Sequence, residues 1–278
     1  MKPTLLILVV FMIAACTERP VKTASRKKAV KAGDGRDYDF SKGKVLSLQP
    51  VLKEVSGIAV LGGLSMAAVE DERGRIYFLN VKTGLIDSTL DFGKNGDYED
   101  LVFMDGVFFV LKSNGDLFRV ASVGRGEARV DKFSFPAKGF EFESLYVDGR
   151  RLVLLAKDAG GPGSFDAFSF EEGVGFSAEP VYTLRATDQV KNFRPSGAAL
   201  NPADGKLYVL CSDGRKLLVC SREGVIEDMY GLAGADYPQA EGIAFTGDGE
   251  LYISNEGKNG PATLIRIPRN QSKTAANE

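Results

Sequence analysis

Hydrophobic and polar residues alternate in short runs, separated by glycine-rich turns, along most of the chain. The clearest example is the pair of runs at 239–245 and 251–256, which flank Gly247-Asp248-Gly249. Apolar runs of this length between Gly and Asp turns predict an antiparallel hairpin. Because the start of one strand lies beside the end of its antiparallel partner, Glu241 and Asn255-Glu256 are expected at one rim.

The opening of this hairpin is repeated along the chain. Its copies begin at Ser56, Glu99, Glu143, Ser196 and Glu241, at intervals of 43, 44, 53 and 45 residues. Second and third strands are predicted after every copy, and a fourth after the first four copies. Repeats of four antiparallel strands with a period near 45 residues are typical of a β-propeller.

The repeats predict a single all-β domain, a propeller of five blades over residues 38–268. The fifth repeat lacks a fourth strand, and an unpaired edge is unfavourable. Residues 44–48 form an apolar run ahead of the first repeat, so we expect this N-terminal strand to close the ring. Six blades are the alternative, with the extra blade inside the long interval 143–196, and a two-sheet sandwich is disfavoured by the spacing.

The first 16 residues have the pattern of a bacterial lipoprotein signal peptide. Lys2 precedes a short apolar run, and Ile13-Ala14-Ala15-Cys16 resembles a lipobox. This resemblance implies that Cys16 carries acyl chains such as palmitate and anchors the protein to the membrane of the cell envelope. Thr17 rather than Asp follows this Cys, which, by resemblance to the sorting of enterobacterial lipoproteins, favours the outer membrane. An ordinary secretory signal is the alternative. Residues 17–37 are expected to form a flexible tether, and 269–278 a polar tail.

Composition removes several function classes. The chain has no His, which excludes Ser-His-Asp triads, Cys-His dyads and His-ligated metal sites. Its net charge of −2 argues against a nucleic-acid partner. Cys211 and Cys220 fall on adjacent predicted strands, but a tight turn at 213–214 does not place them opposite each other, so we expect buried thiols rather than a disulfide.

The inner strand of each blade lines the channel of a propeller, so polar residues at strand openings and at second-strand ends are expected on one channel face. The candidates to contact a ligand there are Glu99, Glu143, Ser196, Asp213, Glu241, Asn255 and Glu256. Converging carboxylates repel one another unless positive charge lies between them. Lys112 and Lys157, at apparently equivalent sites, are candidate charge partners. The alternative is Ca²⁺ or another divalent cation held by Glu241, Asn255 and Glu256.

Three stretches resemble the SdiA-regulated family of YjiK-like propeller proteins. They are 53–58, 193–202 and 239–257. The resemblance implies an exported or membrane-associated propeller, but the family has no agreed activity. Two functions therefore stay open. One is a binding module that presents its channel face to a small ligand or an envelope protein. The other is a metal-dependent hydrolase of the lactonase type, with Glu241 and Asn255 as metal ligands and Asp213 or Lys157 as acid or base.

Overall fold

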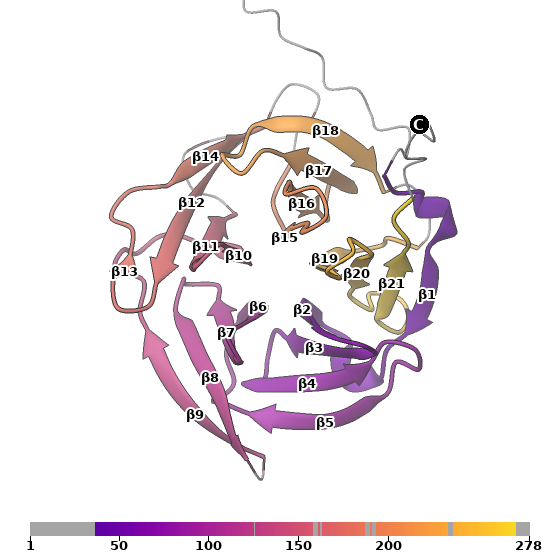
Figure 1. Ribbon diagram of the computed structural model, residues 1–278, viewed down its shortest axis with the longest axis horizontal. Coiled ribbons are helices and arrows are strands. Elements are labelled where there is room, and N and C mark those ends of the chain that lie inside the picture. The colour runs from indigo at the N-terminus through magenta and orange to yellow at the C-terminus, as the bar shows by residue number, and fades with distance from the viewer. Residues whose placement is uncertain are drawn as a thin grey trace, which may run out of the picture.

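The computed structural model describes residues 37–270 except 125, 158–160, 162, 187–189, 191–192 and 233–235. Within these residues the chain forms five antiparallel sheets arranged as blades around a central axis (Figure 1). This confirms the predicted five-bladed propeller. The predicted signal peptide with Cys16, the tether up to residue 36 and the tail after residue 270 lie outside the described residues.

Each blade begins with its inner strand and continues outward. Blades 1 and 2 contain β2 (Val55–Gly62), β3 (Ser65–Glu70), β4 (Arg75–Asn80), β5 (Ile86–Asp91), β6 (Tyr98–Met104), β7 (Val107–Lys112), β8 (Leu117–Gly124) and β9 (Glu127–Phe133). Blades 3 and 4 contain β10 (Phe142–Asp148), β11 (Arg151–Ala156), β12 (Ser164–Glu171), β13 (Gly175–Phe176), β14 (Tyr182–Arg185), β15 (Gly197–Leu200), β16 (Leu207–Cys211), β17 (Lys216–Cys220) and β18 (Ile226–Gly231). Blade 5 contains β19 (Ala240–Phe245), β20 (Leu251–Asn255), β21 (Thr263–Ile267) and β1 (Lys44–Ser47).

Blade 5 joins the two ends of the described chain. β1 pairs antiparallel with β21, with Val45 opposite Ile265, which confirms closure by an N-terminal strand. Tyr38 lies just before this strand and is fully buried. Its hydroxyl donates to the Gly249 carbonyl oxygen at 2.6 Å and accepts from Asn201 Nδ2 at 2.9 Å. The closure therefore connects blade 4 to blade 5 through side chains as well as strands.

The long interval between the third and fourth repeats does not contain another blade. β13 and β14 both pair with β12, so the additional residues extend the outer part of blade 3. Two short 3₁₀ helices, η1 (Phe40–Lys42) and η2 (Pro50–Leu52), flank β1. No helix among the described residues has the length and apolar character that crossing a bilayer requires.

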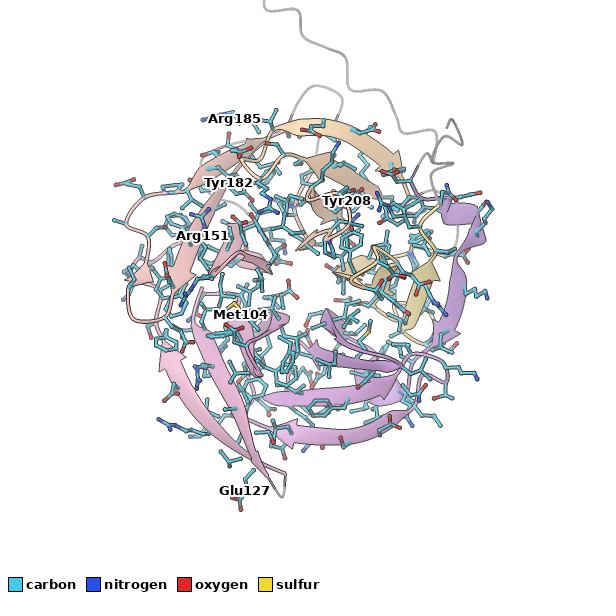
Figure 2. All side chains as sticks on the ribbon, viewed as in Figure 1. Met104, Glu127, Arg151, Tyr182, Arg185 and Tyr208 are labelled. Atoms are coloured by element: carbon cyan, nitrogen blue, oxygen red, sulfur yellow. The ribbon has the colours of Figure 1, made fainter. Side chains whose placement is uncertain are left out.

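The hydrophobic core is divided among the interfaces between adjacent blades, where side chains fill the space between sheets (Figure 2). Middle strands are apolar on both faces because they are covered on both sides. In β7, Phe109 and Leu111 pack toward blade 3, whereas Phe108 and Val110 pack toward blade 1. Outer strands are polar, as in β5, where only Leu90 is buried.

Cys211 and Cys220 are free and buried, in agreement with the absence of a disulfide expected from the sequence. The strand register explains this. Cys211 is paired with Lys216, and Cys220 with Leu207. The Cys211 sulfur accepts hydrogen bonds from the backbone N–H groups of Arg194 and Gly214.

Candidate functional site

In four of the five blades, the pairing between the inner strand and the second strand shifts register near the start of the inner strand. The register shifts between Val55 and Gly57, Tyr98 and Asp100, Phe142 and Ser144, and Ala240 and Ile243. The unpaired residues include the openings of the sequence repeat, Ser56, Glu99, Glu143 and Glu241. Bulges redirect side chains and are frequent beside functional sites. In these four blades the opening residue of the repeat therefore lies outside the regular ladder.

The two serines at these openings connect neighbouring blades. Ser56 Oγ donates to the Tyr98 carbonyl oxygen at 2.7 Å, and Ser196 Oγ donates to the Ala240 carbonyl oxygen at 2.8 Å. Both serines are buried. Ser196, a predicted ligand candidate, thus uses its hydroxyl as a donor between blades 4 and 5.

Close approach of the inner strands depends on the residue that follows each opening. A Cβ atom on Gly197 would overlap the Glu241 carbonyl oxygen, so this position requires glycine. Blade 2 has Asp100 instead, and its carboxylate accepts from the backbone N–H groups of Leu101 and Leu145, each at 2.8 Å. Burial raises the pKa of Asp100 well above its usual range, although these two hydrogen bonds lower it. Asp100 is therefore a link between blades 2 and 3.

The three glutamates at the remaining openings, Glu99, Glu143 and Glu241, form an acidic cluster. Burial, followed by repulsion from Glu143 and Asp97, raises the pKa of Glu99 to about 9. Burial, followed by repulsion from Glu256 and Glu143, raises the pKa of Glu241 to about 8. Because repulsion from Glu143 acts on both of the others, the carboxyl groups of three different blades are linked electrostatically through Glu143.

Lys157 supplies positive charge to this cluster. Its Nζ lies 2.5 Å from Glu143 Oε1 and 3.9 Å from Glu141 Oε1. Burial raises the pKa of Glu143, and the hydrogen bond from Lys157 lowers it in part. In the described part of the chain, neither Glu99 nor Glu241 forms an ion pair. One lysine therefore offsets the burial of only one of the three glutamates.

Lys112 is not the charge partner of Glu99 that the sequence predicted. Tyr98 pairs with Lys112 and Phe142 pairs with Ala156, so Lys112 is equivalent to Ala156 rather than to Lys157. Its Nζ lies 5.5 Å from the centroid of the Tyr98 ring. A shift of one residue moves a strand side chain to the opposite face, which corrects the prediction that Lys112 balances Glu99.

The same register separates Asn255 from Glu256. Asn255 pairs with Ala240, is fully buried, and donates through Nδ2 to Thr263 Oγ1 at 3.2 Å. The pKa of Glu256 is raised by burial and then by Asp71 and Glu54, so this side chain belongs to the acidic end. The predicted metal set of Glu241, Asn255 and Glu256 is therefore split, and the described residues contain no group of three Asp, Glu or Cys side chains arranged to hold a metal ion.

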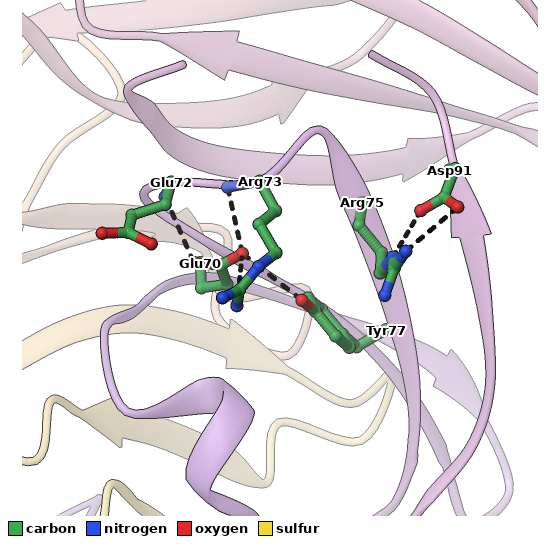
Figure 3. Close-up of polar contacts among 6 residues, drawn as sticks. All are labelled: Glu70, Glu72, Arg73, Arg75, Tyr77 and Asp91. Carbon is green, nitrogen blue, oxygen red and sulfur yellow. Dashed lines mark hydrogen bonds and ion pairs between the residues drawn. The ribbon is translucent and has the colours of Figure 1, made fainter. Parts of the chain in front are cut away.

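In blade 1, Glu70 occupies the position equivalent to Asn255, and Asp71 that of Glu256. Figure 3 shows Glu70 at the turn between β3 and β4. Its carboxylate accepts from the backbone N–H of Arg73 at 3.0 Å and lies 3.6 Å from the Arg73 guanidinium. Tyr77 also donates to it at 3.3 Å. Burial, followed by repulsion from Glu54 and Glu70, raises the pKa of Asp71 to about 6.

The sequence interpretation missed a second polar row, located two residues before each opening. Its acidic members are Glu54, Asp97 and Glu141. Arg194 holds the same place in blade 4, and Gln239 in blade 5. Glu54, Asp97, Glu141 and Gln239 each directly precede the first residue of an inner strand. The carbonyl oxygens of this row accept from the residues after the second strands, as in the 2.7 Å bond from the Lys157 N–H to Glu141. Because these polar residues recur two positions before the openings, the sequence repeat could have identified them.

Blade 4 contributes Ser212 rather than Asp213. Hydrogen bonds from Gln239 and Ser212 lower the pKa of Glu241, although burial outweighs them. Asp213 follows by one residue and is exposed. The acidic end of the channel, as used below, comprises the openings Glu99, Glu143 and Glu241 together with Glu54, Asp71, Asp97, Glu141, Lys157 and Glu256. Acids outnumber bases in it, so its field attracts cations.

Residues 181–260, which contain β14, blade 4 and the two inner strands of blade 5, match the SdiA-regulated family, in agreement with the resemblance found in the sequence. Comparison with curated proteins gives no match. Solved structures with similar folds include the following three. The glutaminyl cyclase of Myxococcus xanthus superimposes with a TM-score of 0.58 and 13% identity, over 82% of this chain and 95% of that one.

A luciferin-regenerating enzyme gives a TM-score of 0.54 and 12% identity, over 81% of this chain and 95% of that one. The gluconolactonase XC5397 of Xanthomonas campestris gives 0.53 and 14%, over 78% and 72%. At these identities the likeness concerns the fold alone.

Proposed function

We propose that this chain is a lipid-anchored binding module of the bacterial cell envelope, whose ligand carries a positive charge and enters the acidic end of the channel. The observation that carries the proposal is the convergence of Glu99, Glu143 and Glu241 from three blades, with Lys157 as the ion-paired base. The similar propellers support only the scaffold on which such a site is built.

The raised pKa values indicate the class of ligand. A carboxyl group with a pKa of about 8 or 9 keeps its proton at neutral pH because no sufficient positive charge offsets its burial. A bound cation removes that cost and displaces the proton. Because Asn255 donates to Thr263 and the described residues contain no group of three Asp, Glu or Cys side chains arranged to hold a metal ion, an organic ammonium or guanidinium fits better than a metal ion.

The test is calorimetry at pH 7.5 on a chain shortened to residues 17–278, with spermidine, arginine ethyl ester and Ca²⁺ as separate probes. We expect an organic cation to bind, with affinity lowered at least tenfold by Glu241→Gln. The matched control is Asp213→Asn, which removes an exposed acid near the same end and is expected to leave affinity unchanged. Absence of heat with all three probes would contradict the proposal, and binding of Ca²⁺ alone would shift it to a metal site.

One observation favours the second candidate, a lactonase-type hydrolase. A carboxyl group that is protonated near neutral pH is suited to act as a general acid, and Glu241 meets this condition. A screen of lactones and phosphoesters tests this function. Turnover that Glu241→Gln abolishes and Asp213→Asn preserves would support the hydrolase. Absence of turnover with every substrate, in a protein that binds the probe cation, would support the binding module.

The anchor is a separate part of the proposal. Its support is the lipobox-like sequence ending at Cys16. Mass spectrometry of the N-terminal peptide is expected to find Cys16 as the acylated first residue. Cys16→Ser is expected to leave the protein unprocessed and without acyl chains. An unmodified Cys16 would contradict the anchor without affecting the binding site.

A further inference from the structure

The end of the propeller opposite the acidic cluster is apolar at its centre. A cavity of about 170 Å³ lies there, lined by three consecutive residues from each inner strand. These are 58–60, 101–103, 145–147, 198–200 and 243–245, and none of them is charged. Phe103 at this mouth is 41% exposed. We call this cavity the apolar mouth.

The turns at the same edge of the blades also expose apolar side chains. This edge contains the turns between first and second strands and those between third and fourth strands. Met104 near the ring centre and Glu127 at the periphery mark its extent in Figure 2. The exposed side chains are Leu64 and Leu85 in blade 1, Val123 in blade 2, Val174 in blade 3 and Val225 in blade 4. Apolar exposure is thus spread around the ring.

Between blades 5 and 1 this edge contains an apolar groove of about 370 Å³. Val45, Leu64 and Leu264 are among its walls, and Lys44, Lys82 and Arg266 line it as well. Arg266 is paired with Glu250 at 2.7 Å. Lys44 and Lys82 form no ion pair within the described residues, so their charges are open to an anionic partner.

The chain enters the propeller at this edge. The fully buried Tyr38 packs 6.2 Å, centroid to centroid, from Phe245, which lines the apolar mouth. Lys44, the first residue of β1, lines the groove. The 36 residues before the described part, which include the apolar run and Cys16, are therefore joined to the molecule beside both features.

We infer that this edge is a membrane-docking face that rests on a bilayer containing anionic lipids. The exposed leucine, valine and phenylalanine side chains enter the interfacial region, and the groove takes an acyl chain whose headgroup phosphate lies between Lys44 and Lys82. Apolar insertion and attraction of lysines to anionic headgroups act together in such surfaces. The inference rests on the proposed anchor for proximity to the membrane, and it directs the acidic end away from the lipid.

The absence of Trp from the chain allows a direct test. Single tryptophans are placed at Phe103 and Leu64 on the proposed face and, as a control, at Asp213 near the acidic end. The full-length lipidated protein is reconstituted into phosphatidylethanolamine–phosphatidylglycerol vesicles with or without brominated acyl chains. We expect brominated lipid to reduce emission at least twofold for Phe103→Trp and Leu64→Trp, and by less than a tenth for Asp213→Trp.

Replacing phosphatidylglycerol by phosphatidylcholine is expected to weaken the quenching of Leu64→Trp. The double substitution Lys44→Glu and Lys82→Glu is expected to weaken it as well. The charge-matched control is Lys53→Glu with Lys258→Glu, two exposed lysines near the acidic end, which should leave quenching unchanged. Protein that floats with vesicles but shows equal quenching at all three tryptophans would overturn the docking face and leave the anchor intact. Protein that does not float would overturn both. Neither result bears on cation binding.

Discussion

The two ends of the central channel are made by the same five inner strands, yet they differ in backbone and in chemistry. At the acidic end most strands begin with a bulge, and the residue placed there is Ser or Glu. At the apolar mouth the ladders are mostly regular, as in blade 3, where Leu145, Tyr146 and Val147 pair in register with β11. The residue type at the openings, Ser or Glu, therefore differs between blades at the end of the channel where the backbone is irregular.

Within the acidic end, serine blades differ from glutamate blades. Ser56 and Ser196 direct their hydroxyls sideways to the next blade, whereas Glu99, Glu143 and Glu241 lie in a field of mutual repulsion. The same backbone position thus either joins blades or presents charge. Stability and ligand attraction should respond separately to substitutions at these two kinds of site.

The largest effect is expected from a substitution that separates inner strands. Gly197→Val places atoms onto the Glu241 carbonyl oxygen, and the required backbone shift should cost about 3 kcal/mol or prevent folding. Chemical denaturation measures this loss. Gly231→Val is the control because a Cβ at Gly231, on the outer strand β18, meets no other atom within 4 Å. An equal loss of stability in both variants would contradict close packing between the inner strands of blades 4 and 5.

The second-largest effect is expected in the pH dependence of stability, and it arises from the acidic end. Between the ordinary glutamate pKa and about 8, the folded protein holds a proton on Glu241 that the unfolded chain has released. Stability should therefore fall as pH rises from 5 to 8, by up to about 1.4 kcal/mol per pH unit for each such group. Melting temperatures across this range are expected to fall less in Glu241→Gln than in wild type. Identical slopes would show that Glu241 titrates normally.

The serine substitutions should affect stability without affecting ligand affinity. Ser56→Ala removes the donor to a buried carbonyl oxygen, and the expected loss is about 1–2 kcal/mol by denaturant titration. Ser196→Ala should behave similarly because its bond to Ala240 is equivalent. A large loss of cation binding in either variant, with stability unchanged, would place these serines among the ligand contacts.

The smallest expected effect comes from the lysine that partly neutralises the acidic end. Lys157→Gln removes the positive charge 2.5 Å from Glu143, so cation affinity should rise a few-fold and the pKa of Glu143 should rise further. Lys112→Gln is the matched control, because that lysine lies over the Tyr98 ring. Calorimetry with the same probe cation separates the two. Weaker binding in Lys157→Gln would mean that Lys157 contacts the ligand itself.

The repeat predicted the ring, its closure and the openings because these depend on spacing alone. It did not resolve the ends of the second strands, where neighbouring residues such as Asn255 and Glu256 point to opposite faces. The bulge at the opening adds one residue to the inner strand, and this shift is invisible in the sequence. The bulge does not explain the misplacement of Lys112, because blades 2 and 3 have the same shift at their openings. Lys157 follows Glu143 by 14 residues whereas Lys112 follows Glu99 by 13, so Ser113 is the residue equivalent to Lys157.

The apolar mouth was present in the sequence but had no distinguishing signal. Residues such as Ile58, Leu101 and Leu145 follow every opening, and alternation alone assigns them to the core. Exposed residues in turns, such as Val174 and Val225, look like strand ends in a one-dimensional pattern. Their exposure depends on how blades pack and twist, which composition and spacing do not encode.

The central claim is that the acidic end lacks enough positive charge and takes it from a ligand. The most direct measurement is a carboxyl-carbon NMR titration of Glu241, alone and with the probe cation that binds in calorimetry. We expect a Glu241 pKa of about 8 in the free protein, lowered by at least one pH unit in the presence of the cation. An ordinary glutamate pKa in both samples would contradict it.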